Sequence, residues 1–396
     1  MTASVPREIE VALHGAVLDP GGPWRREPPR PPSARQPFYD ERFDALTLFY
    51  DVFRDGDDVE ILGPPLLNLE AGLRPLSLRA AGRRYARGFT SQERNRLHRH
   101  RVLGVPAEVR TLRFHSPLGR FALTIGEDMS GSFSGLRVLI TQSRDNPLPW
   151  IARWIDHHVV TQGIDAVLIY DNGSRDYSLD DLRALLRSRR GLRRFAVVDW
   201  PYPWGPTGGP ESIWDSDFGQ HGSWEHAWRR LCRDAETLTF GDVDELIVGP
   251  APTVPERALA SPVGLSSYAR RSVLNIPARP TRELGRMRDH ADYLQFDPSA
   301  PLLTSKYTVA PGALAGTDQL LIHRVEGREA PDEPDVLARH FDGIRIEWRD
   351  GERHPVPDQR LEDLGQPPLA VDGELAEALA RTDPTRTHPA PSGPSA

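Results

Sequence analysis

Three carboxylates stand close together near the middle of the chain. Residues 237–248 read Thr-Leu-Thr-Phe-Gly-Asp-Val-Asp-Glu-Leu-Ile-Val, so that Asp242, Asp244 and Glu245 lie between two apolar runs. Apolar runs this short, bounded by glycine and proline, predict buried strands, and the acids lie where one strand leaves its sheet. Carboxylates this close repel one another unless a cation lies between them, and their oxygens suit Mg²⁺ or Mn²⁺. A solvated acidic turn is the simpler alternative.

The elements that position these acids are predicted from Leu136 onward. Short apolar runs alternate with segments of helical periodicity, which predicts βαβ units and a mostly parallel sheet with helices on both faces. Ligands of such sheets bind beyond the carboxyl ends of the strands. The predicted strands are 136–140, 166–170, 195–198 and 237–240. Three helices are predicted: the first spans 147–160, the second begins after its cap at Ser178, and the third spans 224–233. The polar segments beyond the strands are 141–146, 171–174, 199–204 and 242–245.

The rest of the chain divides by composition. Two pairs of apolar runs around turn residues, 45–53 with 59–62 and 109–114 with 120–125, predict hairpins. Further strands are expected at 264–268, 306–309 and 320–324, and one at 8–17. We therefore expect a flexible N-terminal segment (1–35), a smaller β-rich accessory domain (36–130), an α/β catalytic domain (131–350) and a Pro/Ala-rich disordered tail (365–396) with a short helix at 374–380.

Composition also excludes several classes of protein. The net charge of −7 argues against a general nucleic-acid-binding protein. The chain has no apolar run of about 18 residues and no signal peptide at its start, so no membrane span is expected. A single cysteine, Cys232, excludes an internal disulfide and favours the cytoplasm. Lys306 is the only lysine among 49 basic residues, either by chance or because a lysine is needed there.

Several short motifs follow one another along the predicted strand ends. They are Ile-Thr-Gln-Ser-Arg-Asp-Asn at 140–146, Trp-Ile-Ala-Arg-Trp-Ile-Asp-His-His at 150–158, Ile-Tyr-Asp-Asn-Gly-Ser-Arg-Asp at 169–176 and Phe-Gly-Asp-Val-Asp-Glu at 240–245. In this order they resemble the glycosyltransferases of families 2 and 92, which have the GT-A fold. The resemblance covers about residues 136–345 and leaves the β-rich region outside.

The resemblance implies a metal-dependent enzyme. It would move a sugar from a nucleoside-diphosphate sugar to a hydroxyl of a glycan or small-molecule acceptor, with inversion. Mn²⁺ or Mg²⁺ would act as a Lewis acid on the departing diphosphate. Asp244 is then the expected metal ligand, and Asp242 binds the ion or the donor ribose. His323 is a candidate metal or phosphate ligand, with a surface histidine as the alternative, and Lys306 is a candidate point charge beside the diphosphate.

Contacts with the nucleotide are expected after the first two predicted strands. The candidates are Thr141, Gln142, Arg144, Asn146, Asp171, Asn172 and Ser174. Members of the family commonly carry acidic residues near the first of these loops, and this chain departs from that pattern. Trp224 is a candidate for stacking on sugar or base, with a core position as the alternative. His340 and Arg345 are weaker candidates that close the site from the far side.

The group that accepts the proton of the acceptor stays open at this point. Four acids of the predicted loop and helix start could accept this proton, and they are Glu211, Asp215, Asp217 and Glu225. Of these four, Asp217 and Glu225 are the preferred candidates.

Two other functions fit the pair of Asp242 and Asp244. One is an inactive nucleotide-sugar-binding or scaffold protein, and the other is a nucleotidyltransferase or phosphohydrolase with two-metal chemistry. The absence of a Gly-x-x-x-x-Gly-Lys loop argues against the last.

Overall fold

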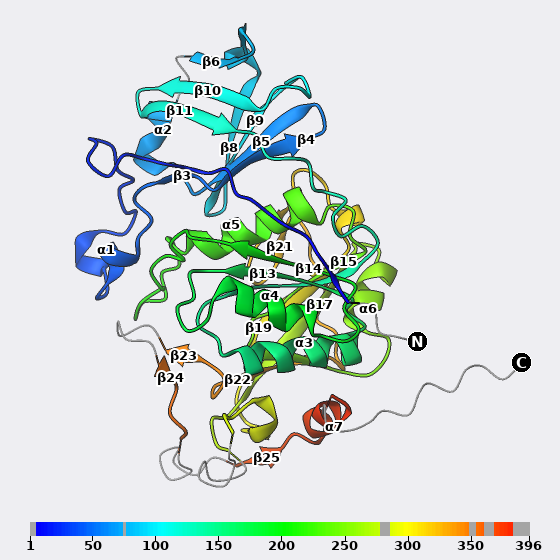
Figure 1. The fold of residues 1–396 in the computed structure, drawn as a ribbon. Helices are drawn as coiled ribbons and strands as arrows, with labels where there is room; N and C mark the ends of the chain where they lie inside the picture. Colours follow the sequence, from blue (N-terminus) through cyan, green and yellow to red (C-terminus); the bar gives the residue numbers. More distant parts are fainter. Residues whose placement is uncertain (1–4, 74–76, 278–285, 348–353, 360–367, 383–396) are drawn as a thin grey trace, which may run out of the picture.

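A computed structural model describes residues 5–73, 77–277, 286–347, 354–359 and 368–382. In these residues the chain forms one large mixed sheet covered by helices, with a group of smaller antiparallel sheets packed at one end (Figure 1). The protein is therefore of mixed α/β class, as its alternating pattern predicted. No helix in the described part of the chain is long and apolar enough to cross a membrane.

The centre of the large sheet is parallel. Its strands are β12 (Arg137–Ser143), β13 (Ala166–Asp171), β14 (Arg194–Asp199) and β15 (Thr237–Phe240). Successive side chains of these strands point to opposite faces, and both faces are buried, which explains the nearly continuous apolar runs. One face packs against α5 (Phe218–His226), and the other packs against α3 (Leu148–Gln162) and α4 (Leu179–Arg187).

Local sequence signals explain where α4 begins and where α3 ends, whereas the start of α5 depends on burial in the tertiary structure. Ser178 caps α4 through a reciprocal pair of bonds with Asp181, as predicted. Gly163 ends α3 in the left-handed conformation. The helix predicted from Trp224 begins earlier, at Phe218, and continues as a π-helical turn, η4 (Ala227–Leu231). The early start was missed because the first turns of α5 are buried on all sides and carry no amphipathic period.

The second half of the large sheet is mixed rather than parallel. Its strands are β16 (Glu245–Val248), β17 (Leu265–Val273), β19 (Leu303–Val309) and β22 (Leu337–Phe341). With β1 (Arg7–Glu8) at the far edge, the full order is β1-β14-β13-β12-β15-β19-β17-β22-β16. The strand predicted at 320–324 is wrong: β20 (Gln319–Leu320) and β21 (Val325–Glu326) form a tight hairpin in which Leu321 N donates to Arg324 O.

The predicted β-rich region contains both predicted hairpins. One sheet has the order β4-β5-β9-β8 and the other β11-β10-β6-β7. Apolar side chains of both sheets share one core. From the other face of the sheet β4-β5-β9-β8, Phe53, Leu62 and Leu97 join a core of the large sheet. The strands are β4 (Asp51–Asp55), β5 (Asp58–Gly63), β6 (Ser77–Ala80), β7 (Arg83–Arg84), β8 (Phe89–Arg94), β9 (Leu97–Val102), β10 (Thr111–Ser116) and β11 (Gly119–Thr124).

A buried polar contact joins this region to the large sheet. Asp51 accepts a hydrogen bond from His226 Nε2 at 2.8 Å and forms an ion pair with Arg230. Tyr50 packs against Trp200 with ring centroids 5.1 Å apart. All five side chains are buried, so the small sheets and α5 form one continuous interior.

The N-terminal segment of the chain is more ordered than the sequence predicted. Residues 5–35 are not a flexible segment, because β1 pairs with β14, and β2 (Ala16–Val17) pairs with β3 (Thr47–Phe49). The fully buried Arg26 donates to three backbone carbonyls there. The helix expected at 374–380 is confirmed as α7 (Gly373–Arg381), while most of the expected disordered tail lies outside the described residues. The remaining helices and strands are α1 (Tyr39–Arg42), α2 (Glu70–Leu73), α6 (Val254–Ala260), β18 (Gln295–Phe296), β23 (Ile346–Glu347), β24 (His354–Pro355) and β25 (Ala370–Val371).

Candidate functional site

A cleft of about 830 Å³ opens at the carboxyl ends of β12, β13, β14 and β15. The loops after these four strands meet there because parallel strands end at one edge of a sheet. Two segments outside the sheet complete the walls, one from α1 and one that follows β22. The lining residues are Glu41, Arg42, Gln142, Ser143, Arg144, Asn146, Asn172, Gly173, Arg175, Pro201, Tyr202, Pro203, Trp204, Gly205, Gln220, Asp242, Val243, Asp244, Ile344, Arg345 and Ile346.

Asp242 and Asp244 both line this cleft, on the same side of the sheet. A tight turn holds them: Glu245 N donates to Asp242 O at 3.0 Å, and Asp242 N donates to Glu245 Oε2 at 3.1 Å. Gln220 Nε2 also donates to Asp242 Oδ1 at 3.3 Å. The turn between β15 and β16 therefore presents both aspartates to one space, as the Asp-x-Asp spacing predicted.

Lys306 lies behind Asp242 rather than in the cleft. Its Nζ donates to Asp242 Oδ2 at 2.8 Å and lies 3.5 Å from Glu245 Oε2. The lysine side chain is 1% exposed, whereas that of Asp242 is 34% exposed. Burial alone would lower the pKa of Lys306, but the two carboxylates raise it. The expected direct contact of Lys306 with a diphosphate is therefore wrong, because the strand directs this side chain into the interior.

Trp224 is a core residue. Its ring stacks on Phe240 with centroids 4.5 Å apart, and it has no exposed surface. The Lys306 ammonium group lies 5.3 Å from the centre of the same ring. A stacking role on sugar or base is therefore excluded, and the indole instead forms part of the buried wall around the lysine.

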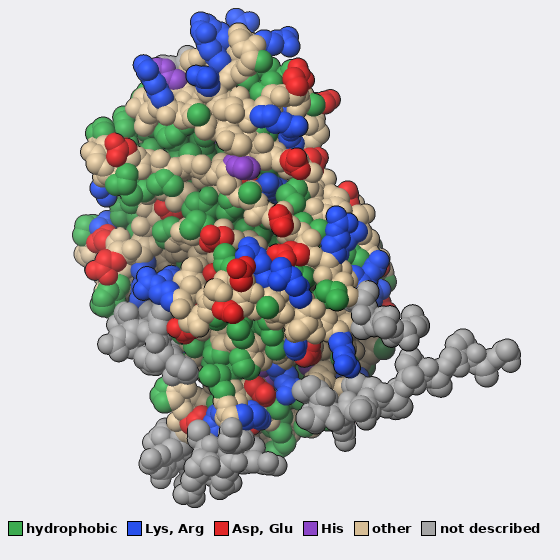
Figure 2. Space-filling model, viewed as in Figure 1, with side chains coloured by type: hydrophobic (Ala, Val, Ile, Leu, Met, Phe, Trp, Pro, Cys, Tyr) green, Lys and Arg blue, Asp and Glu red, His purple; other side chains and the backbone are tan. Residues whose placement is uncertain are grey.

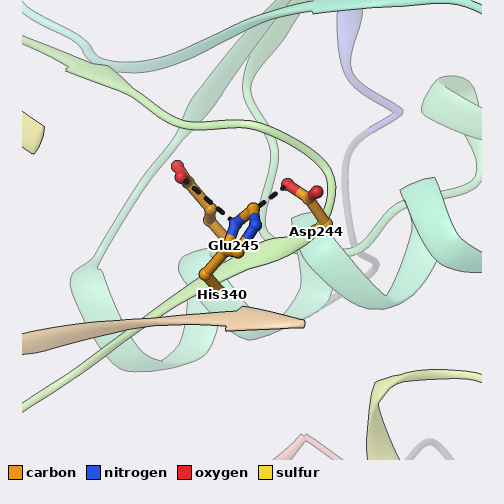
Figure 3. Close-up of side chains that lie close together, drawn as sticks. All are labelled: Asp244, Glu245 and His340. Carbon is orange, nitrogen blue, oxygen red and sulfur yellow. Dashed lines mark ion pairs between the residues drawn. The ribbon is translucent and has the colours of Figure 1, made fainter. Parts of the chain in front are cut away.

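Asp244, Glu245 and His340 form a compact cluster of ligand atoms. One atom from each lies within 4.8 Å of the others, and the three side chains point toward one another (Figure 3). His340 Nδ1 is 3.8 Å from Asp244 Oδ1 and 3.7 Å from Glu245 Oε1. The antiparallel pairing of β16 with β22 places His340 directly opposite Glu245. Strand register, not sequence proximity, therefore brings the imidazole to the acids.

The electrostatics of this cluster favour a cation. Burial and the neighbouring acids raise the pKa of Asp244 to about 7. Burial alone would lower the pKa of His340, but Asp244 and Glu245 raise it to about 9. Asp244 Oδ1 and His340 Nδ1 are buried, and neither has a hydrogen-bond partner among the residues that the structure describes. Two carboxylates and an imidazole, with two unpartnered atoms, are a donor set that fits a divalent cation, and the nitrogen ligand favours Mn²⁺ over Mg²⁺.

His323 is not part of the cluster found among the described residues. Its Nδ1 donates to Ser305 O at 3.1 Å. Burial, together with the positive charges of Lys306 and Arg270, lowers the pKa of His323 to about 4. The prediction of His323 as the metal-ligating histidine is therefore not supported by the geometry, and His340, the weaker candidate, occupies that position.

The expected nucleotide-contacting residues separate into two groups. Gln142, Arg144, Asn146 and Asn172 line the cleft. Asn172 is also fixed in place, because its Nδ2 donates to Trp200 O at 2.8 Å and to Tyr202 O at 2.7 Å. Its side-chain oxygen is therefore the atom available to a ligand.

Thr141, Asp171 and Ser174 do not line the cleft and instead shape its loops. Thr141 is buried within β12. Asp171 Oδ2 accepts from Gly173 N at 3.2 Å and from Ser174 N at 3.0 Å. Ser174 Oγ accepts from Asp145 N at 2.9 Å. The prediction of direct ligand contact is wrong for these three, because Thr141 is buried in its strand and the turn uses polar atoms of Asp171 and Ser174 for its own backbone.

Both preferred proton acceptors are buried away from the cleft. Glu225 is 1% exposed, and its two oxygens bind Arg229 Nε and Leu320 N, each at 2.6 Å. Asp217 is 1% exposed and forms an ion pair with Arg96 at 3.2 Å. Burial alone would raise the pKa of Asp217, but hydrogen bonding to His221 and the Arg96 charge lower it. Neither acid can reach a substrate in the cleft, so these two predictions are wrong.

The other two open candidates, Glu211 and Asp215, also lie outside the lining of the cleft. Asp215 is occupied by Arg30, with Nη2 2.7 Å from Oδ1. No proton acceptor from the predicted loop and helix start therefore faces the space beside Asp244.

Sequence reasoning missed the contribution of α1. Glu41 and Arg42 line the cleft although they belong to the predicted β-rich region (36–130), outside the predicted catalytic domain. Tyr39 anchors the helix, because its hydroxyl lies 2.7 Å from Ser216 Oγ. Phe43 packs edge-on against Phe218, with centroids 5.9 Å apart. No local signal marks this docking, since it depends on one hydrogen bond and one ring contact with residues 216 and 218, which lie far away along the chain.

Positive side chains outnumber negative ones along the cleft. Four arginines and three carboxylates are among its described lining residues. Planar guanidinium groups bind phosphate and carboxylate oxygens through paired hydrogen bonds. With a divalent cation at Asp244, the cleft suits a ligand that carries several negative charges. The arginines are Arg42, Arg144, Arg175 and Arg345, and the acids are Glu41, Asp242 and Asp244.

No protein-family model matches the chain, and no curated protein matches its sequence.

Proposed function

We propose that the protein is a metal-dependent glycosyltransferase of GT-A architecture that moves a sugar from a nucleoside-diphosphate sugar to an acceptor hydroxyl with inversion. The observation that carries the proposal is the convergence of Asp244, Glu245 and His340 within 4.8 Å at a cleft with four arginines. This combination suits a diphosphate bound together with a divalent cation. We place the reaction in the cytoplasm, because the single buried cysteine fits a reducing compartment.

Each part of the cleft has a task in this reaction. Asp244 and His340 would hold a divalent cation, which would supply Lewis-acid stabilisation to the leaving diphosphate. Arg144, Arg175 and Arg345 add positive charge around the same anion. Asp242 has a partly exposed carboxylate held by Lys306, and this carboxylate accepts hydrogen bonds from the donor ribose. Gln142, Asn146 and Asn172 provide amides that orient the nucleotide.

Glu41 is the carboxylate that we assign to the acceptor proton. Among the described residues that line the cleft, the other two acids are Asp242 and Asp244. Asp242 is bound to Lys306, and Asp244 lies in the metal cluster. Glu41 is exposed and is presented by a helix anchored at Tyr39. General-base catalysis contributes about 10²–10⁴-fold, so Glu41→Gln should lower kcat by about that factor while donor binding persists.

The function is tested by a donor screen read by mass spectrometry, with Mn²⁺ or Mg²⁺ added. The wild type should release sugar from at least one nucleotide sugar, and Asp244→Asn and His340→Gln should each lose metal-dependent release. His323→Gln is the matched control, since this histidine lies outside the cluster and should retain activity. Full activity of the Asp244 and His340 variants would reject the metal site.

The rival functions give different results in the same assays. A binding or scaffold protein would bind Mn²⁺ and a nucleoside diphosphate without turnover of any donor. A nucleotidyltransferase would release pyrophosphate when supplied with a nucleoside triphosphate and a sugar phosphate. Two-metal chemistry fits the cleft less well, because the Lys306 ammonium group lies against Asp242 and repels a second cation at that carboxylate.

A further inference from the structure

The sheet β11-β10-β6-β7 has one apolar face and one basic face. Leu78, Leu112 and Phe114 point inward and belong to the core of the β-rich region. The outward-facing positions of the same strands carry arginines. Figure 2 shows Lys and Arg side chains gathered at the end of the molecule where β6 and β10 lie in Figure 1. The exposed arginines of this outer face are Arg79, Arg84, Arg113 and Arg120.

Strand register aligns these arginines in a row. Arg113 lies directly opposite Arg79, and Arg79 lies directly opposite Arg84. On the other side of β10, His115 lies opposite Arg120. Neighbouring strands are about 4.8 Å apart, and like charges directly opposite one another destabilise a sheet. The row therefore costs folding free energy that the sheet itself does not recover.

In the described part of the chain, the strands that form the outer face carry no compensating acid. None of the residues of β6, β7, β10 and β11 is Asp or Glu. The adjoining sheet differs, since Arg99 forms a two-point pair with Glu60, and Arg101 pairs with Asp58. In the adjoining sheet these two arginines are thus neutralised by carboxylates. The outer face keeps an unneutralised positive charge on a chain whose net charge is −7.

We propose that the outer face (Arg79, Arg84, Arg113 and Arg120) binds an anionic lipid surface through headgroup phosphates. An open sheet face offers a broad array of guanidinium groups, which suits a two-dimensional surface of phosphates. Single-stranded nucleic acid is recognised by aromatic platforms, but the aromatic rings of this sheet, Phe114 and Phe121, point to its inner side. The proposal is independent of the catalytic function proposed above.

The test is vesicle co-sedimentation of the full chain. Vesicles of phosphatidylcholine with an equal share of phosphatidylglycerol are compared with vesicles of phosphatidylcholine alone, at low and physiological salt. Each arginine near an anionic surface contributes about fivefold in partitioning. The triple variant Arg79→Gln/Arg84→Gln/Arg113→Gln should therefore bind the anionic vesicles about a hundredfold more weakly than the wild type.

The matched control removes the same total charge elsewhere. Arg7, Arg190 and Arg324 are exposed, and none of them forms an ion pair with another described residue, so their triple Gln variant should bind like the wild type. The outer-face variant should also melt no lower than the wild type at low salt, because like-charge repulsion is relieved. Equal binding to neutral vesicles, an equal loss in the control variant, or binding of an oligonucleotide but not of anionic vesicles would each overturn the proposal.

Discussion

Metal binding at Asp244, Glu245 and His340 should release protons and strengthen steeply with pH. Burial and neighbouring acids raise the pKa of Asp244 to about 7, and the adjacent carboxylates outweigh burial and raise the pKa of His340 to about 9. A divalent cation needs an ionised carboxylate and a neutral imidazole. Below about pH 9 the cation must therefore displace a proton from His340, so rising pH favours the metal.

The number of protons displaced by each metal ion determines how steeply the metal affinity changes with pH. From about pH 7 to about pH 9 one proton leaves for each ion bound, so affinity should rise about tenfold per pH unit, or about 1.4 kcal/mol. Below about pH 7 Asp244 is also protonated, and the dependence steepens toward about a hundredfold per unit. The pair titrates as a unit, so these two ranges describe the cluster rather than single residues.

Calorimetric titration of Mn²⁺ in buffers of different ionisation enthalpy measures both the affinity and the protons released. His340→Gln should bind Mn²⁺ more weakly, and each ion should displace at most one proton at any pH, because Asp244 is then the only group of the cluster that holds a proton. His323→Gln should keep the wild-type pH dependence, because the pKa of His323 is lowered to about 4 and its ring is already neutral. An affinity of the wild type for Mn²⁺ that stays constant between about pH 7 and about pH 9, or release of two protons by His340→Gln below about pH 7, would refute the reasoning.

Three further predictions concern buried charges. Asp51→Ala should lower the free energy of unfolding by about 3–5 kcal/mol, measured by urea denaturation, because Arg230 would remain buried without its partner. Glu225→Gln should also destabilise the protein, since it weakens a buried pair with Arg229, yet kcat should stay near the wild-type value. Lys306→Met should weaken binding of the nucleotide-sugar donor at least tenfold in a calorimetric titration, because Asp242 loses a charged hydrogen bond.

Each of these has a result that contradicts it. A loss below about 1 kcal/mol for Asp51→Ala would mean that the contact between the small sheets and α5 is not anchored by this ion pair. A large fall in kcat for Glu225→Gln at unchanged thermal stability would return that acid to the catalytic candidates. Lys306→Arg is the control for charge: the larger guanidinium group overfills a fully buried site, so donor affinity should fall although the charge is kept. If both Lys306 variants bound the nucleotide-sugar donor with wild-type affinity, Lys306 would have no role in donor binding.

Local sequence patterns were sufficient for the parallel half of the sheet. Its strands are short apolar runs covered on both faces, and turn residues bound each run. The capping pair of Ser178 and Asp181 likewise needs only residues three apart. Because parallel strands end at one edge, the convergence of Asn172 and Asp242 on one cleft followed from these patterns alone.

Long-range pairing decided which residues of the site meet. His323 and His340 were both candidates by type, but the register of β16 with β22 brings only His340 to Glu245. Side-chain direction along β19 turns Lys306 into the interior, where it holds Asp242. Strand pairing and register depend on which strand edges are free to pair, and the local hydrophobic period of the sequence does not indicate them.

The amino-acid sequence by itself therefore determined the elements of the α/β centre and the turn that carries Asp242 and Asp244. Only the tertiary structure decided that Glu225 is buried, that His340 completes the acidic cluster, and that α1 brings Glu41 to the cleft. The physical reason is the range of the interactions. Strand and turn preferences act over a few residues, whereas burial and sheet register depend on contacts between segments that lie far apart along the chain.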